Sequence, residues 1–327
     1  MSILTRLIPD RFVLLLLLTI LAAALLPVSG AAAVYAGHAV SVAIFLLFFL
    51  HGLRLPRAEV VVAMRNWRLQ GLMLAFVFAF MPLVAMAAVR LQGGLLPGGL
   101  PQGLVVGLLF LGMLPSTVQS AISYASLAGG NIAASVMASA LLNLAGIALT
   151  PLLVALVIGA SGGAAIGSDT VIRILAILLL PFALGQIAQG WLGSWAMRNK
   201  PLLTVLDRSA IVLAVYVAFS SAVAGGQVQS LDWTVLGVLC ALIAAMLGVA
   251  MAAAWMLGGV MSLPRADQIS LLFAGSHKSI ATGAPLAAIL FAGPQAGLVI
   301  LPALIYHQLQ LIVSAPMASR LAKSTKD

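Results

Sequence analysis

Long apolar blocks, separated by short polar connections, run through the whole chain. An apolar block of about 20 residues is long enough to cross the hydrocarbon core of a bilayer as an α-helix. The pattern predicts ten membrane-spanning helices, at residues 12–28, 37–53, 67–89, 103–127, 132–159, 170–190, 209–225, 233–258, 268–291 and 296–318. The first block, with Arg6 and Arg11 before it, also fits a signal peptide. Its removal would leave an odd number of spans, so we interpret it as the first membrane helix.

The composition agrees with an all-α integral membrane protein. Hydrophobic residues make up 63% of the 327 residues and charged residues only 7%. The net charge of +9 comes from basic residues scattered over loops, so we attribute it to membrane topology and expect no nucleic-acid partner. The single cysteine, Cys240, excludes an intramolecular disulfide, and the spacing of His, Cys and carboxylates gives no metal site. We therefore expect no cofactor.

The distribution of basic residues predicts the orientation. With the N-terminus inside, all of the 16 Lys and Arg residues except Arg90, Arg173 and Lys278 lie in cytoplasmic segments or span ends. Such an excess is the positive-inside signature of membrane proteins. We expect both termini in the cytoplasm and a location in the plasma membrane (the inner membrane in a bacterium), with lipid as the surrounding partner.

The two halves of the chain share landmarks in the same order. Asn66-Trp67 precedes one long apolar block, and Asp232-Trp233 precedes another. Because each half has five spans, the second half enters the membrane in the opposite orientation, which makes an inverted repeat. We assign residues 1–160 to the first repeat and 161–327 to the second. The alternative is that Leu-, Ala- and Gly-rich helices simply look alike.

Each half also contains a polar, helix-breaking segment inside an apolar span. The fourth span has Pro115 followed by hydroxyl and amide residues, and the ninth has a polar run between Gly275 and Pro285. Non-helical backbone at membrane depth is tolerated where it is buried in protein or lines a wet cavity, and half-helix N-termini there suit an anionic group. A simpler interpretation is that the hydroxyls bond back to their own helices and proline only bends them. Matched segments favour a central substrate or ion site at Thr117, Gln119, Ser120, Ser276, His277, Lys278 and Ser279.

Lys278 is the only formally charged residue in the apolar block 271–291. A lysine at the bilayer centre costs about 2.5–3.5 kcal/mol on insertion scales, so it is expected where it has a function. All seven acidic residues lie at or beyond predicted span ends, which leaves no intramembrane carboxylate to pair with it. A lysine without a counter-ion either loses its proton or recruits an anion, and both outcomes suit a carrier of organic anions. Snorkelling of the side chain to the interface is the alternative.

Three further candidates lie in neighbouring spans. His307 belongs to a polar cluster in the last span, which suits hydrogen bonds either to a ligand or to the ninth span. Ser135 and Ser139 lie one turn apart on one face of the fifth span. They either line the site or simply let helices pack closely.

Several short motifs carry a resemblance to a known family. They are Ser276-His277-Lys278-Ser279 with Gly283 and Pro285, Phe291-Ala292-Gly293, the run from Pro302 to His307, His51-Gly52-Leu53 and Met81-Pro82. With them the chain resembles, over essentially its whole length, the bile acid:sodium symporter (solute carrier family 10) superfamily, particularly its seventh-member-like branch and related bacterial transporters. The resemblance implies a core domain from spans 3–5 and 8–10 and a panel domain from spans 1, 2, 6 and 7. It also implies that the broken fourth and ninth helices cross beside the ligand, and that movement of core against panel gives alternating access.

The family's sodium ligands carry over to this chain only in part. The fourth-span Ser-Asn pair of the better-known symporters aligns with Gln119-Ser120, and their fifth-span hydroxyls align with Ser135 and Ser139. Their third-span glutamine aligns with Val77, their ninth-span glutamate has no equivalent, and Lys278 replaces a glutamine. A lost carboxylate and a gained fixed cation should damage both sodium sites. We expect the Lys278 ammonium to take the role of a bound cation, with proton exchange on the lysine as a replacement for sodium exchange.

Three functions fit a polar centre in an apolar chain. A secondary active transporter of a small organic anion explains the matched polar segments and Lys278 together. A non-transporting membrane regulator or scaffold on the same fold is the alternative. An intramembrane hydrolase with a Ser120–Lys278 dyad is the third, but no nucleophile-elbow or metal signature supports enzyme action. We therefore expect a carrier and no enzymatic activity.

Overall fold

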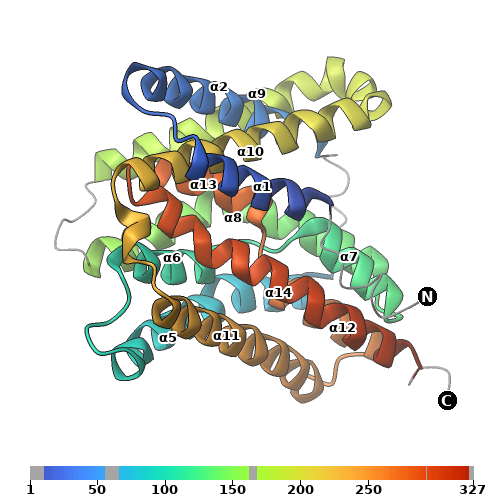
Figure 1. Cartoon of the computed structure of the whole chain (residues 1–327). Coiled ribbons are helices and arrows are strands. Elements are labelled where there is room, and N and C mark those ends of the chain that lie inside the picture. The colour runs from blue at the N-terminus through green and yellow to red at the C-terminus, as the bar shows by residue number, and fades with distance from the viewer. Residues whose placement is uncertain (1–10, 56–65, 162–167, 292, 324–327) are drawn as a thin grey trace.

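The computed structural model describes residues 11–55, 66–161, 168–291 and 293–323, and within these ranges the chain is helical with no β-strand (Figure 1). The α-helices are α1 (Arg11–Leu25), α2 (Gly30–Arg54), α4 (Trp67–Ala75), α5 (Met81–Leu95), α6 (Gln102–Met113), α7 (Val118–Leu127), α8 (Ile132–Ser161), α9 (Ser168–Arg198), α10 (Lys200–Ala224), α11 (Trp233–Val260), α12 (Arg265–Ser276), α13 (Ile280–Leu290) and α14 (Ala296–Lys323). A π-helical turn, η3 (Phe76–Phe80), joins α4 to α5, and a 3-10 turn, η4 (Gln227–Ser230), precedes α11.

Seven helical segments in the described ranges are long and apolar enough to cross a membrane: α2, the continuous α4–η3–α5, α8, α9, α10, α11 and α14. The pair α6 and α7 passes the same test together but is bent by 56°, and counts as an eighth if it is one span. α1 has 15 residues, and α12 and α13 have 12 and 11, so each alone is shorter than a typical span. The chain therefore has the helices of an integral membrane protein, while the division into ten spans stays a prediction.

Several helices continue beyond the apolar blocks that predicted them. α2 begins at Gly30 rather than at residue 37, and α10 begins at Lys200 rather than at residue 209. α9 ends at Arg198 rather than at residue 190, so that only Asn199 separates α9 from α10. At the end of α9 and the start of α10, charged and amide side chains lower the hydropathy, but Arg, Lys and Gln are good helix formers. The start of α2 has no charged or amide side chain, and its alanines favour a helix. Hydropathy thus marks where the chain is apolar and not where its helices end.

The helices pack in two groups. α2 packs along α9, α10 contacts α2, and α1 packs on α10, and we call these the four-helix group. α4 to α8 and α11 to α14 form the central group, in which α6 packs on α14 and α5, and α12 packs on α7 and α11. Figure 1 shows α2, α9 and α10 in the upper part with α1 below α10, whereas α5 and α11 lie at the bottom and α14 runs diagonally through the middle. The groups meet where α10 contacts α13 and α14 and where α8 contacts α9.

Glycines set the closest helix contacts within the four-helix group. A Cβ atom on Gly52 of α2 would overlap the backbone carbonyl of Phe182 on α9, and one on Gly185 of α9 would overlap the carbonyl of Phe49 on α2. Small residues of this kind let membrane helices approach closely enough for van der Waals packing to hold them together. The reciprocal pair of glycines therefore fixes α2 against α9.

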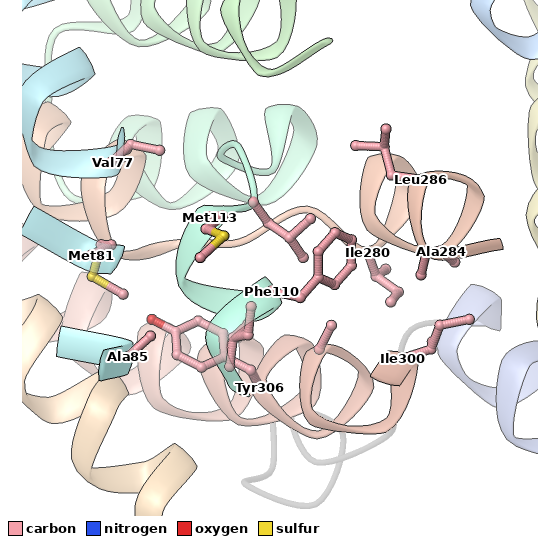
Figure 2. Close-up of a cluster of buried hydrophobic side chains, with 14 of the residues drawn as sticks. Val77, Met81, Ala85, Phe110, Met113, Ile280, Ala284, Leu286, Ile300 and Tyr306 are labelled. Carbon is pink, nitrogen blue, oxygen red and sulfur yellow. The ribbon is translucent and has the colours of Figure 1, made fainter. Parts of the chain in front are cut away.

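A buried apolar cluster fills the middle of the central group. Figure 2 shows side chains from η3, α5, α6, α13 and α14 meeting there, among them Val77, Met81, Phe110, Ile280 and Tyr306. The ring of Tyr306 is fully buried, and its hydroxyl donates a hydrogen bond of 2.6 Å to the backbone carbonyl of Ser276. This cluster surrounds the last turns of α6 and α12, where the candidate site begins.

Candidate functional site

Two helices of the central group are interrupted and meet at their breaks. α6 ends at Met113 and α7 begins at Val118, while α12 ends at Ser276 and α13 begins at Ile280. The two non-helical segments, 114–117 and 277–279, are hydrogen-bonded to each other, and we call them the crossing. The backbone N–H of Ser279 donates to the carbonyl of Pro115 at 2.9 Å, and the Thr117 hydroxyl donates to the carbonyl of Lys278 at 2.7 Å. Both polar segments of the sequence are thus breaks in a helix.

Lys278 lies inside the crossing, with 1% of its surface exposed. Its Nζ atom donates to the carbonyl oxygens of Leu114 at 2.8 Å, Gly112 at 2.9 Å and Val77 at 3.3 Å. Gly112 and Leu114 lie at the C-terminal end of α6, where the helix dipole places partial negative charge. The snorkelling interpretation was wrong, because the side chain is enclosed by protein.

An amide side chain from α14 holds the unwound backbone of Lys278. The Oε1 atom of Gln310 accepts a hydrogen bond from the N–H of Lys278 at 2.8 Å, and its Nε2 donates to the carbonyl of Lys278 at 3.1 Å. The same Nε2 is 2.9 Å from Nδ1 of His307. Backbone groups freed by a helix break need such partners at membrane depth. The polar cluster of the last span therefore does hydrogen-bond the ninth-span segment.

His277 points away from Lys278 and joins three helices. Its Nδ1 is 2.9 Å from the hydroxyl of Ser120 on α7, and its Nε2 is 2.8 Å from the hydroxyl of Ser314 on α14. The ring is fully buried and packs edge-on against Tyr124 and Phe273. Ser120 is therefore paired with His277, while Lys278 is paired with carbonyls, and the Ser120–Lys278 dyad of the hydrolase interpretation is absent from this structure.

A cavity of about 830 Å³ lies between the two helix groups, beside the crossing. The first turns of α7 and α13 both line it, with Val118 and Gln119 from one and Ile280 and Ala281 from the other. Six of the residues predicted for the site line this cavity: Thr117, Gln119, Ser120, Ser139, Ser279 and His307.

Four predicted site residues do not line the cavity: Ser135, Ser276, His277 and Lys278. The Ser135 hydroxyl donates to the hydroxyl of Ser270 on α12 at 2.9 Å, and the Ser276 hydroxyl bonds back to the carbonyl of Leu272 at 2.6 Å. For Ser276 the simpler interpretation, in which a hydroxyl bonds to its own helix, therefore describes the geometry. All four are buried in the central group, whereas the other six line the cavity.

The opposite wall of the cavity is charged, and sequence reasoning missed it. Arg54 of α2 and Asp207 of α10 form an ion pair between Nη1 and Oδ2, with side chains 27% and 16% exposed, and Arg208 of α10 lies beside them. Nε and Nη2 of Arg54 and Oδ1 of Asp207 are buried without a hydrogen-bond partner. His51 also lines this wall. In the sequence the arginines fit the positive-inside pattern, which gives no reason to place them at a binding site. The one sequence feature that could have indicated this wall is Asp207, an acidic residue within a basic segment.

Comparison with known proteins identifies the class of this membrane protein. Residues 10–323 match the model of the SBF-like CPA transporter family, and the chain belongs to this family. It is 41% identical over 322 residues to the protein PA2026 of Pseudomonas aeruginosa, covering 98% of this chain and 96% of that protein. It is 36% identical over 318 residues to the proposed symporter YfeH of Escherichia coli K12, covering 97% and 94%. Sodium/bile acid cotransporter 7 of Rattus norvegicus is 26% identical over 276 residues, covering 84% and 80%. The resemblance to the bile acid:sodium symporter superfamily is thereby confirmed.

Proposed function

We propose that this chain is a secondary active transporter that moves a small organic anion by alternating access. The four-helix group is the panel, the central group is the core, and the two groups move against each other around the crossing. The observation that carries the proposal is the pair of helix N-termini, at α7 and α13, that line one cavity between the groups. Unpaired backbone N–H groups and the helix dipole give such N-termini an affinity for anions.

The cavity walls support an amphipathic anion as the substrate. Two arginines and one aspartate line the cavity among the described residues, so its charged wall carries a net positive charge. Apolar side chains such as Phe48, Ile147 and Ile312 complete the lining. A volume of about 830 Å³ is in the range of small-molecule sites. One relative is named as a bile acid cotransporter, and bile acids are amphipathic anions. Both sterol-like anions and smaller carboxylates fit the chemistry of this cavity.

The orientation proposal places the cavity on the cytoplasmic side. Arg54 and Arg208 lie on the cavity wall, and Arg198 and Lys200 lie where α9 meets α10. These residues belong to the basic side of the predicted topology, which puts both termini in the cytoplasm and the protein in the plasma membrane. Several residues of that pattern lie outside the described residues, namely Arg6, Arg57, Arg65 and Lys326, together with the acidic Asp10, Glu59 and Asp327.

The order of the helices supports the inverted repeat. In the half assigned to residues 1–160, α4–η3–α5 is followed by the broken pair α6 and α7 and then by α8. In the half assigned to residues 161–327, α11 is followed by the broken pair α12 and α13 and then by α14. Matched broken helices are the usual place of the central site in repeat-built transporters.

Uptake into proteoliposomes tests the proposal. The full chain is reconstituted and offered a panel of radiolabelled anions, from acetate and pyruvate to cholate, with protein-free liposomes as the blank. Saturable uptake and counterflow of at least one anion are expected, both for the native chain and for Cys240→Ser, which changes an exposed residue that does not line the cavity. Uptake should be lost in Gln119→Trp, which places a bulky side chain in the cavity beside the N-terminus of α7. Absence of counterflow for every anion would contradict the carrier and favour a non-transporting regulator on the same fold.

A further inference from the structure

The surroundings of the Lys278 ammonium have the composition of a monovalent-cation site. Its three hydrogen bonds go to backbone carbonyl oxygens that come from two separate elements, η3 and the end of α6. η3 is a π-helical turn, and such turns change the register of the backbone hydrogen bonds and are frequent at functional sites. Carbonyl oxygens that converge at a helix break are also the groups that coordinate sodium in broken-helix transporters.

The hydrogen-bond count indicates a charged lysine. An ammonium group has three N–H donors and no acceptor, and here each donor has one carbonyl. A neutral amine would turn its lone pair toward one of these oxygens. The carbonyl dipoles face the positive charge, and among the side chains that the structure describes no carboxylate pairs with it: Asp207, Asp232 and Asp267 are each bonded elsewhere.

The same oxygens cannot also hold a dissociable sodium ion. Any cation that binds the carbonyls of Val77, Gly112 and Leu114 must take the place that Nζ occupies. Relatives of this chain carry sodium in their names, but at the crossing the residues of this chain do not fit an added sodium ion.

We infer that Lys278 is a tethered cation that permanently fills a carbonyl-lined cation site at the crossing, so that the protein needs no sodium there. Removal of the ammonium should turn the crossing into a site for sodium itself. The consequence for transport rests on the proposed function: the Lys278 ammonium stays with the protein when the substrate site faces either side of the membrane. The anion therefore crosses with its own charge and without a partner cation.

The thermal stability of the purified full chain in detergent tests this inference without reference to transport. The native chain, Lys278→Ala and Lys278→Met are compared in sodium chloride and in choline chloride of equal ionic strength. The native chain should have the same Tm in both salts. Lys278→Ala should have a lower Tm in choline and regain roughly 2–4 °C or more in sodium, saturating with concentration as a binding ion does. Lys278→Met, whose apolar chain fills the same space, should stay low in both salts.

The other outcomes of this comparison also decide for or against the inference. Saturable stabilisation of the native chain by sodium would show a dissociable sodium site that lysine has not replaced. Equal Tm values for Lys278→Ala in the two salts would show that the three carbonyls are not a cation site. Recovery of folded Lys278→Ala only when sodium is present throughout purification would support the inference. Failure to recover it in either salt would contradict the claim that removal of the ammonium leaves a sodium site. Because these readouts are binding and stability, they stand even if no transported anion is found.

Discussion

The backbone of Lys278 and the side-chain amide of Gln310 form a two-point pair, with Lys278 N–H to Gln310 Oε1 at 2.8 Å and Gln310 Nε2 to the Lys278 carbonyl at 3.1 Å. The pair copies the hydrogen bonds that an uninterrupted helix would have supplied. It ties α14 to the crossing while the Lys278 ammonium ties the crossing to α6 and η3. One residue is thus held from both sides, through its backbone and through its side chain.

Replacing Gln310 by Leu should destabilise the protein strongly. The substitution leaves the buried N–H of Lys278 without a partner, which costs about 1–3 kcal/mol, while the Lys278 carbonyl keeps the hydroxyl of Thr117. Gln308→Leu, two residues earlier on α14, is the matched control because the Oε1 atom of Gln308 has no hydrogen-bond partner. The Tm of Gln310→Leu should fall well below that of Gln308→Leu. Equal values for the two variants would contradict the role of the pair.

Two Gly→Ala substitutions on α9 should change the stability of the protein in opposite directions. Gly185→Ala should lower the Tm, because its Cβ would overlap the backbone of Phe49 on α2. Gly190→Ala, five residues further along α9, meets no atom within 4 Å and should raise stability by about 0.5–1 kcal/mol through the lower flexibility of alanine. If both variants were equally stable, the close α2–α9 contact would be contradicted.

The Arg54–Asp207 pair should act on both stability and substrate affinity. Removing one partner leaves a partly buried charge unpaired. The stability losses of Arg54→Ala and Asp207→Ala should therefore sum to more than the loss of the double variant, by a coupling of about 0.5–3 kcal/mol in a thermal-unfolding cycle. Arg54→Gln should also raise the KM for anion uptake, because it removes positive charge from the cavity wall. An unchanged KM would exclude Arg54 from the anion's surroundings.

Cysteine labelling tests the side on which the cavity opens. In a Cys240→Ser background, Gln119→Cys and Ser123→Cys place thiols at exposed positions that line the cavity, whereas Ser276→Cys places one at a fully buried position. A membrane-impermeant thiol reagent should label the first two from the cytoplasmic side in inverted vesicles, and should leave the third unlabelled. Labelling only from the opposite side would reverse the proposed orientation.

Much of the helix plan was predictable because apolar blocks, glycines and prolines leave local marks. The breaks at Pro115 and at Ser276–Ser279 followed from polar residues inside apolar runs, and both breaks are present. The meeting of the two breaks, given in advance only by the family resemblance, is present as well.

The partners of Lys278 were not predictable, because they are backbone carbonyls of Val77, Gly112 and Leu114, and a sequence shows only side chains. The Arg54–Asp207 wall was missed for another reason. Arg54 is the last residue of α2 and Asp207 lies within α10, but both lie outside the apolar blocks, so hydropathy places them at span ends or in connections.

The two serines of the fifth span show the limit of spacing arguments. Ser135 and Ser139 are one turn apart, which predicts one shared face. Four residues of an α-helix nevertheless turn it by about 40° beyond a full circle, so two such residues can meet different neighbours. Ser135 bonds Ser270 on α12, whereas Ser139 lines the cavity. Only the packing of the neighbouring helices distinguishes them.

The most direct test of sodium-independent anion transport is uptake by proteoliposomes that contain no sodium. A potassium gradient with valinomycin sets the membrane potential, and choline replaces all of the sodium. The uptake of one radiolabelled anion, chosen because the proteoliposome panel shows that it is transported, is then measured. We predict that an inside-positive potential drives uptake and that adding sodium leaves the rate unchanged. A pH gradient at constant potential should also leave the rate unchanged, because Lys278 keeps its proton at the crossing. Uptake that requires sodium and follows the sodium gradient would contradict the central claim that Lys278 has taken the cation's place.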